Sequence, residues 1–405
     1  MTIKSLTAYR ENDFGLSADT DASSLSILRT DIFEDQDQFS EELNISGRVD
    51  RLNYVVGLYY IEENIFTDTT VNALIPGLQI KPNPTVNTKA WAALAQGTYD
   101  VTDQLSLTAG IRYTDEKKDF SQNYRIQLAA NGVVIVGPVE YDLEGNYTAW
   151  TPKFGIQYKA SEDVLLYASA TRGFKSGGFN FATASPINGY DPEFLWSYEA
   201  GFKSDLMDRR LRVNGSFFYY DYTDLQVQAF IVPGSIDITN AADAKVKGLE
   251  LEVLARPAEG FDIGGTLAYL DATYKTYNPA FGPGGIQFDA SGNRLSSSPK
   301  WAYSVYAQYE FPVGDVGNVF VRGEFAWKDE HFFTPQNVAI EGQDSYGLLN
   351  ASVGFNSEDG HWQVIAYGRN LTGEDYFVST VSFTPVIAGH PGQPRTYGLR
   401  LVYEY

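Results

Sequence analysis

Histidine and cysteine are the first residues to examine, because they supply most general bases, nucleophiles and zinc ligands in proteins. The chain of 405 residues contains no cysteine and three histidines, which are His331, His361 and His390. Without cysteine, disulfides, zinc–thiolate sites, iron–sulfur clusters and a thiol nucleophile are excluded. The histidines lack the short spacing at which two side chains reach one zinc ion. We therefore expect no metal site, no catalytic residue and no enzymatic activity.

An acidic run near the start of the chain could suggest a calcium site. Its members are Asp31, Glu34, Asp35 and Asp37. A calcium-binding EF-hand loop needs oxygen ligands at alternate positions around a central glycine, and this run offers neither. We therefore interpret the run as a solvated stretch of charge.

Three glycines, Gly173, Gly177 and Gly178, could be mistaken for a phosphate-binding loop. A dinucleotide-binding fold needs a strand, a glycine turn and a helix in that order, and no helical pattern follows these glycines. We expect instead that they allow strand twist and close packing against a neighbour. No motif in the chain predicts a cofactor.

The charge and hydropathy of the chain exclude two further classes of protein. The formal net charge is −21, so the chain repels phosphates and no nucleic-acid partner is expected. The mean hydropathy is −0.25, and no apolar run approaches the roughly 18 residues that a membrane-spanning helix needs. A membrane-spanning β-strand is compatible with this hydropathy, because it alternates apolar and polar residues.

Long stretches of the chain alternate apolar and polar residues with period two, as a strand with two different faces requires. Leu105, Leu107 and Ile111 share one face of such a stretch, and Ser106 and Arg112 share the other. Similar stretches surround positions 249–253, 319–328 and 362–369. Alternation alone fits both a soluble sandwich, whose apolar face looks inward, and a membrane barrel, whose apolar face meets lipid.

Connection lengths separate these two cases. Short turns are expected at 49–51, 101–104, 161–163, 205–210, 257–260, 312–318 and 357–360, and long connections at about 67–87, 120–145, 277–298 and 334–343. Outer-membrane barrels have short turns on one side of the membrane and long loops on the other. A soluble sandwich has no reason to keep this alternation along the whole chain.

The predicted fold is all-β, a transmembrane antiparallel up-and-down β-barrel of the outer-membrane type. We count about 16 strands of roughly 10–16 residues, which exceed the 5–6 residues of ordinary strands and suffice to cross a bilayer. Polar strand faces would then line a wet lumen, and Arg172 and Lys175 are expected to lie there. Ligand-binding residues are expected on loops and polar faces, but the sequence singles none out.

Aromatic residues make up 15% of the chain and gather near both ends of the expected strands. This placement predicts two interfacial girdles, because an aromatic ring with one polar tip suits a boundary between lipid and water. The expected members are Trp91, Tyr99, Tyr113, Trp150, Tyr158, Tyr219, Tyr220, Tyr309 and Trp327.

The carboxyl terminus reads as an amphipathic strand that ends on an aromatic residue. Tyr397, Leu399 and Leu401 fall on one face together with Tyr403 and Tyr405. A solvated tail does not normally end in this way. The ending resembles the terminal strand that outer-membrane barrels present to their assembly machinery.

Several segments, taken in order, resemble the barrel of the TonB-dependent receptor family. They are Trp150–Gly155, Tyr167–Asn180, Pro192–Lys203, Asn240–Ala242, Lys247–Glu252 and Gly368–Phe377. Each segment is a weak match alone, but their order and the ending at Tyr405 are specific. The resemblance covers essentially the whole chain and is clearest from about 146 to 405.

The resemblance implies a receptor in the outer membrane of a Gram-negative bacterium. Such receptors import scarce nutrients, namely ferric siderophores, cobalamin, haem or oligosaccharides, and draw energy through TonB. The implied partners are outer-membrane lipid, the TonB complex, the barrel-assembly machinery and a small nutrient ligand.

The sequence departs from the family pattern in two respects. A full receptor has a plug domain inside a 22-stranded barrel, whereas this chain shows no plug-like segment, no TonB box and about 16 strands. We therefore expect residues 1–405 to form one incomplete barrel domain that lacks the plug and about six strands. The opening segment Ile3–Asn12 already resembles an internal barrel strand.

Two alternative functions remain open from the sequence. A passive porin that never had a plug would share the strand pattern. A soluble β-rich glycan-binding protein would share the composition, and solubility without detergent would support it.

Overall fold

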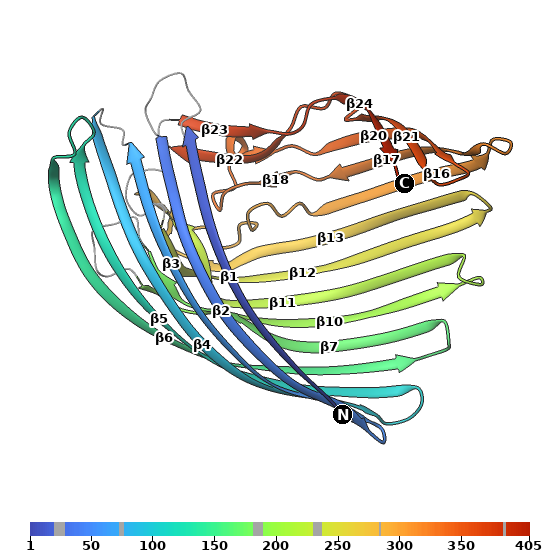
Figure 1. Cartoon of the computed structure of the whole chain (residues 1–405), viewed down its shortest axis with the longest axis horizontal. Helices are drawn as coiled ribbons and strands as arrows, with labels where there is room; N and C mark the ends of the chain where they lie inside the picture. The colour runs from blue at the N-terminus through green and yellow to red at the C-terminus, as the bar shows by residue number, and fades with distance from the viewer. Residues whose placement is uncertain (20–28, 73–76, 181–188, 230–236, 283–284, 384–385) are drawn as a thin grey trace.

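The computed structural model describes residues 1–19, 29–72, 77–180, 189–229, 237–282, 285–383 and 386–405. Sixteen strands form one sheet in which sequence neighbours pair antiparallel, and Figure 1 shows this sheet curved into a trough. The predicted strand number and all-β class are confirmed. The strands are β1 (Thr2–Asp19), β2 (Arg29–Val49), β3 (Leu52–Asn72), β4 (Leu78–Asp100), β5 (Leu105–Leu128), β6 (Val134–Lys159), β7 (Val164–Lys175), β10 (Glu193–Leu206), β11 (Leu211–Ala229), β12 (Asp237–Ala258), β13 (Phe261–Tyr277), β16 (Trp301–Pro312), β17 (Gly317–Lys328), β20 (Tyr346–Ser357), β21 (Trp362–Arg369) and β24 (Thr396–Tyr403).

The sheet has two free edges. Within the described residues, β1 pairs only with β2, and β24 pairs only with β21. The opening segment is therefore a strand, as expected, and in this chain it is an edge strand. The amphipathic terminal strand is also confirmed, since Tyr397, Leu399 and Leu401 are 62–72% exposed on one face of β24.

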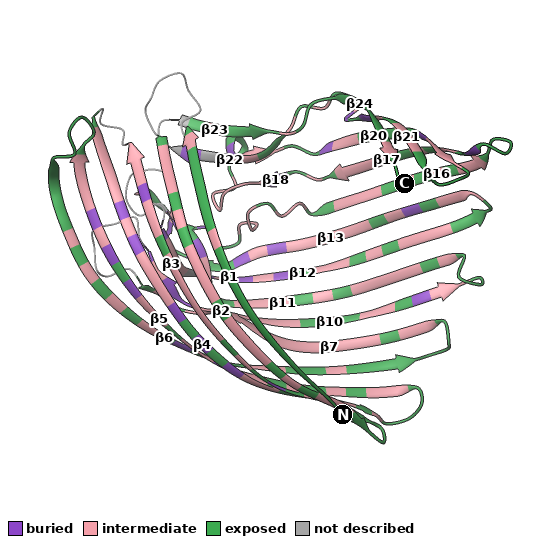
Figure 2. Ribbon diagram, viewed as in Figure 1, coloured by how far each residue is buried: buried purple, intermediate pink, exposed green. Residues whose placement is uncertain are grey.

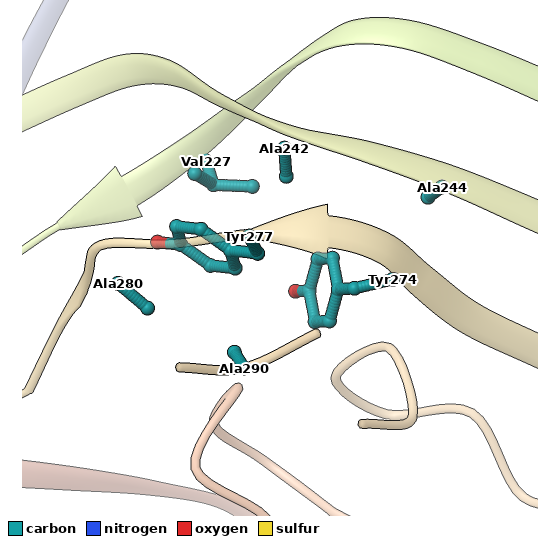
Figure 3. Packing of buried hydrophobic residues seen from close by; sticks show 7 residues of the cluster. All are labelled: Val227, Ala242, Ala244, Tyr274, Tyr277, Ala280 and Ala290. Atoms are coloured by element: carbon teal, nitrogen blue, oxygen red, sulfur yellow. The ribbon is translucent and has the colours of Figure 1, made fainter. Parts of the chain in front are cut away.

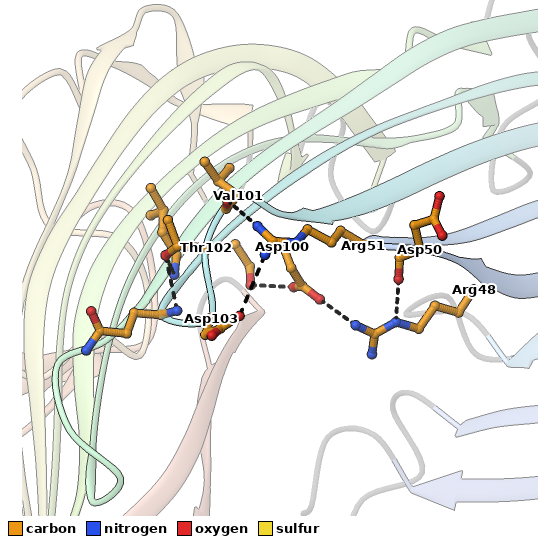
Figure 4. A network of polar contacts seen from close by, with 10 residues as sticks. Arg48, Asp50, Arg51, Asp100, Val101, Thr102 and Asp103 are labelled. Atoms are coloured by element: carbon orange, nitrogen blue, oxygen red, sulfur yellow. Dashed lines mark hydrogen bonds and ion pairs between the residues drawn. The ribbon is translucent and has the colours of Figure 1, made fainter.

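The short turns lie where the sequence predicts them, all at one end of the sheet. Side chains join two of them, as Figure 4 shows. Arg48 Nε donates to the carbonyl oxygen of Asp50 at 2.9 Å, and Arg48 Nη2 lies 3.2 Å from the Asp100 carboxylate. Arg51 Nη1 donates to the carbonyl oxygen of Val101 at 2.9 Å. Such exposed ion pairs contribute little stability, about 0–1 kcal/mol each, so the turns themselves set the strand register.

Two of the expected long loops are instead hairpin tips. The β3–β4 ladder still pairs Val71 with Ile80, and the β5–β6 ladder still pairs Gln127 with Val134. The expectations for 67–87 and 120–145 were therefore wrong. These segments have the polar composition of loops because the strands continue into water, where neither face needs to be apolar throughout.

Two prolines in β4 occupy a local gap in the ladder. Pro82 and Pro84 lie between the pairs Phe66–Thr85 and Val71–Ile80, where β3 and β4 are not paired. Proline has no N–H to donate, so it is tolerated where the ladder is interrupted. Their presence made the segment read as a loop.

The expected connections 277–298 and 334–343 do leave the sheet. The first contains the short hairpin of β14 (Ala280–Phe281) with β15 (Gln287–Phe288). The second contains the 3₁₀-helix η2 (Ala339–Glu341) and β19 (Gly342–Gln343), which pairs with β18 (His331–Phe332) just before it. Two more hairpins join β8 (Gly178–Phe179) with β9 (Gly189–Tyr190), and β22 (Phe377–Phe383) with β23 (Val386–Pro391).

A small buried cluster lies where the connection 277–298 meets β11, β12 and β13. Figure 3 shows its members, which are Val227, Ala242, Ala244, Tyr274, Tyr277, Ala280 and Ala290. Burial raises the pKa of the Tyr277 phenol, which lies beyond the aromatic rows described below. Figure 2 shows that most of the sheet, by contrast, is exposed or half-buried. Among the described residues, no helix has the length and apolar character to cross a membrane.

Candidate functional site

The two faces of the sheet differ in chemistry. Residues directly opposite each other on paired strands share a face, so the pairing assigns every strand position. We call the face with Phe154, Leu249 and Val321 the apolar face, and its opposite the polar face. Phe154 and Val321 are 54% and 47% exposed, and Phe217, opposite Leu249, is 64% exposed. The large apolar side chains therefore do not converge on a dry interior. This agrees with the predicted membrane barrel, in which they face lipid.

Two rows of aromatic side chains bound this apolar face. One row includes Trp91, Tyr113 and Trp150, whose ring centroids are 5.3 and 4.7 Å apart in sequence order. The other row, nearer the short turns, includes Tyr99 and Tyr158. Positions 91 and 99 are eight residues apart, or about 26 Å along a strand at about 3.3 Å per residue. With a strand tilt of about 40°, this spacing gives about 20 Å, close to the roughly 25 Å apolar band of outer-membrane barrels.

The expected aromatic residues follow this pattern with one exception. Tyr219, Tyr309 and Trp327 also lie on the apolar face, since they are opposite Tyr198, Phe261 and Tyr303. Tyr220 lies opposite Ser197 and Val246, on the polar face. The expectation that Tyr220 joins a girdle was wrong, because two successive tyrosines in a strand must point to opposite faces.

The polar face carries hydrogen-bonded charges between the two rows. Tyr167 Oη donates to Glu199 Oε1 at 2.6 Å, and Asn214 Nδ2 donates to Glu252 Oε2 at 2.9 Å. These residues and Lys203 border shallow grooves of about 440–450 Å³. This surface is wettable and acidic, and it can present hydrogen-bond acceptors to whatever occupies the trough.

Polarity changes sides beyond the first aromatic row. On β3–β6 the apolar face now carries ion pairs, of Lys89 with Glu62 at 2.9 Å and of Lys117 with Asp119 at 3.0 Å. The opposite face becomes apolar and aromatic beyond the same row, on strands β1–β6. Its members include Phe14, Leu16, Ile32, Ile65, Phe120, Tyr124, Tyr141 and Leu143. The strands therefore leave hydrocarbon at this row, and the inside of the trough is lined with rings above it.

The glycines that resemble a phosphate loop serve close packing. A Cβ on Gly177 would collide with the ring of Tyr147 and the carbonyl oxygen of Tyr190, and one on Gly178 would collide with the Tyr190 ring. Lys118 Nζ also donates to the carbonyl oxygen of Gly177 at 2.8 Å. Close packing is thus confirmed at these two positions, whereas Gly173 has open space around its Cα.

Of the two cations expected in the lumen, one was misplaced. Lys175 lies opposite Glu193 and shares the polar face with Tyr167. Arg172 lies opposite Trp196 on the apolar face, so its expected place in the lumen was wrong. Arginine can hold its stem on an apolar surface while its guanidinium reaches the polar boundary, and no local sequence pattern indicates that arrangement.

Two asparagines, whose roles the sequence alone does not indicate, tie the connections together. Asn180 Nδ2 donates to the carbonyl oxygen of Ile238 at 2.9 Å, and Ile238 N donates back at 2.8 Å. Asn240 Nδ2 donates to the carbonyl oxygens of Asp191 and Asp224, each at 2.8 Å. Both asparagines belong to segments that carried the family resemblance, so these motif residues hold loops in place.

The histidines and the acidic run lie in different elements of the structure. All three histidines lie outside the long sheet, and Nδ1 of His331 is 3.1 Å from the carbonyl oxygen of Asp329. Asp31 and Asp37 lie within β2, where they contact Arg29 and Asn64. In the described part of the chain, no cluster of three or more histidines or acids could hold a metal ion.

Comparison with known proteins decides the family. The sequence profile described as "TonB dependent receptor-like, beta-barrel" matches residues 2–371. The chain belongs to the TonB-dependent receptor family. Members of this family are proteins of the Gram-negative outer membrane, so the aromatic rows mark the two boundaries of that membrane.

The relatives include receptors for metal chelates. The metal-pseudopaline receptor CntO of Pseudomonas aeruginosa is 29% identical over 267 residues, which cover 64% of this chain and 34% of that protein. The ferric-pyoverdine 358 receptor of Pseudomonas putida is 22% identical, over 82% of this chain and 37% of that protein. This TonB-dependent receptor chain therefore spans about a third of the length of these curated relatives.

Solved structures show the same fold. The ferric yersiniabactin uptake receptor FyuA from Yersinia pestis has a TM-score of 0.82 at 17% identity, covering 100% of this chain and 58% of that one. The copper transporter OprC has a TM-score of 0.72 at 12% identity, covering 100% of this chain and 62% of that one.

Proposed function

We propose that this chain forms the wall of an outer-membrane receptor that imports a metal chelate with energy from TonB. The observation that carries the proposal is the trough itself, which is lined by rings on the outer side and by charges farther in. A chelate needs apolar surface to leave bulk water and polar partners to pass onward. The names of two relatives, the metal-pseudopaline receptor and the ferric-pyoverdine receptor, support this substrate class.

The domain organisation expected from the sequence is part of the proposal. The free edges of β1 and β24 and the greater length of the neighbours support about six further strands and a plug domain in the working receptor. An edge in lipid would leave backbone groups unpaired at a cost of several kcal/mol each, so the wall must close. The terminal strand would engage the assembly machinery, and the protein would act without enzymatic chemistry.

Uptake measurements test this proposal. A strain deleted for the intact gene should lose uptake of one radiolabelled metal chelate, and deletion of TonB should abolish the same uptake. Uptake that persists without TonB would instead establish the passive-porin alternative. Unchanged uptake of every chelate tested in the gene deletion would refute the substrate class.

A matched pair of variants on β1 tests whether the trough side of the sheet binds the chelate. Phe14 is 48% exposed on the trough side, and Tyr9 is 65% exposed on the opposite face of the same strand. In the intact receptor, Phe14→Ala should weaken chelate binding by about tenfold, because a buried aromatic contact contributes roughly 1–2 kcal/mol. Tyr9→Ala should leave binding unchanged, and equal effects of the two variants would contradict the assignment of faces.

A further inference from the structure

The guanidinium of Arg172 lies in an unusual place. It is on the apolar face of the sheet, at the row of Trp91, Tyr113 and Trp150. Arg172 is directly opposite Trp196, and its Nη1 lies 3.4 Å from the carbonyl oxygen of Trp150. The guanidinium carbon is 4.2 Å from the centroid of the Phe194 ring. The charge is thus held among three aromatic residues at the depth where hydrocarbon gives way to polar headgroups.

Arg172 forms no ion pair with any described carboxylate. Its buried Nε has no hydrogen-bond partner among the described residues, and Nη1 has only the long contact to Trp150. A guanidinium has five N–H donors, so most of its donors remain available to a ligand from outside the chain. A cation in this position is costly unless an anion approaches it.

Four other cations on the same face are already paired. Lys89 contacts Glu62, Lys117 contacts Asp119 and Glu144, Lys247 contacts Asp271, and Lys275 contacts Asp221. The residue directly opposite Arg172 on β10 is Trp196, and no described acid forms an ion pair with Arg172. Charge complementarity at this point must therefore come from the membrane.

We propose that Arg172, with Trp150 and Trp196, binds the phosphate of an anionic lipid headgroup in the outer leaflet. Arginine matches phosphate oxygens with two parallel N–H donors, which gives both strength and orientation. The two tryptophans would flank the upper acyl chain and headgroup junction, as interfacial tryptophans do. The site rests on the geometry of this face and not on the proposed nutrient.

Native mass spectrometry of the intact receptor tests this site. The receptor is equilibrated with equal amounts of phosphatidylcholine and phosphatidylglycerol, and the retained lipids are counted. Wild type should retain phosphatidylglycerol preferentially, and Arg172→Gln should reduce that preference about tenfold, as expected for the loss of a charge-assisted hydrogen bond. Lys89→Gln, which removes a paired cation from the same face, should leave the preference unchanged.

A further variant and a competition experiment test whether the bound group is a lipid headgroup. Arg172→Lys keeps the charge but loses the planar fork, so it should retain an intermediate preference and remains informative should the glutamine variant fold poorly. Inorganic phosphate at 10 mM should not displace the bound lipid. Equal retention by wild type and Arg172→Gln, or displacement by phosphate alone, would overturn the assignment to a lipid headgroup.

Discussion

The strands at the start of the sheet and those at its end are held together in different ways beyond the membrane. Strands β2–β6 have 21–26 residues and continue as paired hairpins far beyond the row of Trp91, Tyr113 and Trp150. Strands β16, β17 and β20 have 12 residues, and β16 begins at Trp301, in that row itself. Main-chain pairing holds the first region together, whereas side chains must hold the second.

The side-chain joints of the second region are specific. Glu341 is 3% exposed and accepts hydrogen bonds from Thr334 Oγ1, at 2.7 Å, and from the Ser382 hydroxyl. It therefore links η2 to the β22–β23 hairpin. Asn337 and Arg294 join their connections by two reciprocal bonds of 2.8 and 3.1 Å. We infer that single substitutions should loosen this region and leave the tall hairpins intact.

The largest expected effect concerns the membrane boundary at the row of Trp91, Tyr113 and Trp150, beyond which the two regions differ. Phe154 lies midway between Trp150 and Tyr158 on the apolar face, and Thr148 lies on the same face just beyond Trp150. Phe154→Arg should destabilise the folded receptor by about 2–4 kcal/mol, the cost of a cation at the bilayer midplane. Thr148→Arg should change stability by less than about 0.5 kcal/mol, as a surface substitution does.

Urea unfolding of the intact receptor in lipid vesicles measures both substitutions. Similar losses for Phe154→Arg and Thr148→Arg would place the boundary elsewhere.

The next largest effect is expected at Glu341. Glu341→Ala leaves the half-buried hydroxyl of Thr334 and the buried hydroxyl of Ser382 without their acceptor, which should cost about 1–3 kcal/mol in local stability. Hydrogen exchange of residues 331–343 and 377–383 should accelerate, while exchange in β5 stays unchanged. Protection equal to wild type in both connections would show that Glu341 is not the joint.

A comparable but more confined effect is expected at Asn370. This residue is 4% exposed, and its side chain donates to the carbonyl oxygens of Glu374 and Gln393 at 2.8 and 3.1 Å. It also accepts from Glu374 N at 2.8 Å. Asn370→Ala should cost about 1–2 kcal/mol and raise protease cleavage within 371–395. Cleavage at the wild-type rate would contradict the role of Asn370 as a loop anchor.

The smallest effect is expected in the tall hairpins. Lys117 contacts both Asp119 and Glu144, and its side chain is 50% exposed. Lys117→Ala should change stability by about 0–1 kcal/mol, because exposed ion pairs are screened by water and salt. The same urea titration measures it, and a loss as large as that of Glu341→Ala would remove the proposed difference between the regions.

The sequence predicts the strands and turns well because both depend on local pattern. Alternation around Leu105 and the turn after Val49 need no knowledge of distant partners. The hairpin tips at 67–87 and 120–145 were missed because a paired strand in water has the composition of a loop. Pro82 and Pro84 added to that impression, and only the interrupted β3–β4 ladder explains them.

Side-chain roles were harder to predict than strands. The expectation for Arg172 assumed that every charge faces the lumen, and its actual face follows from pairing with Trp196. The asparagine joints include bonds from Asn180 to Ile238 and from Asn240 to Asp191, which lie 58 and 49 residues away in sequence. Contacts of that range are set by the assembled sheet and leave no local signal.

The reversal of polarity along β3–β6 also fixes how deeply the wall sits in the membrane. Moving the wall inward would carry Lys89 and Lys117 with their carboxylate partners into hydrocarbon. Moving it outward would expose the apolar side chains around Phe154 to water. Each displacement raises the free energy. The hairpins therefore keep the outer end of the wall at a constant height above the bilayer.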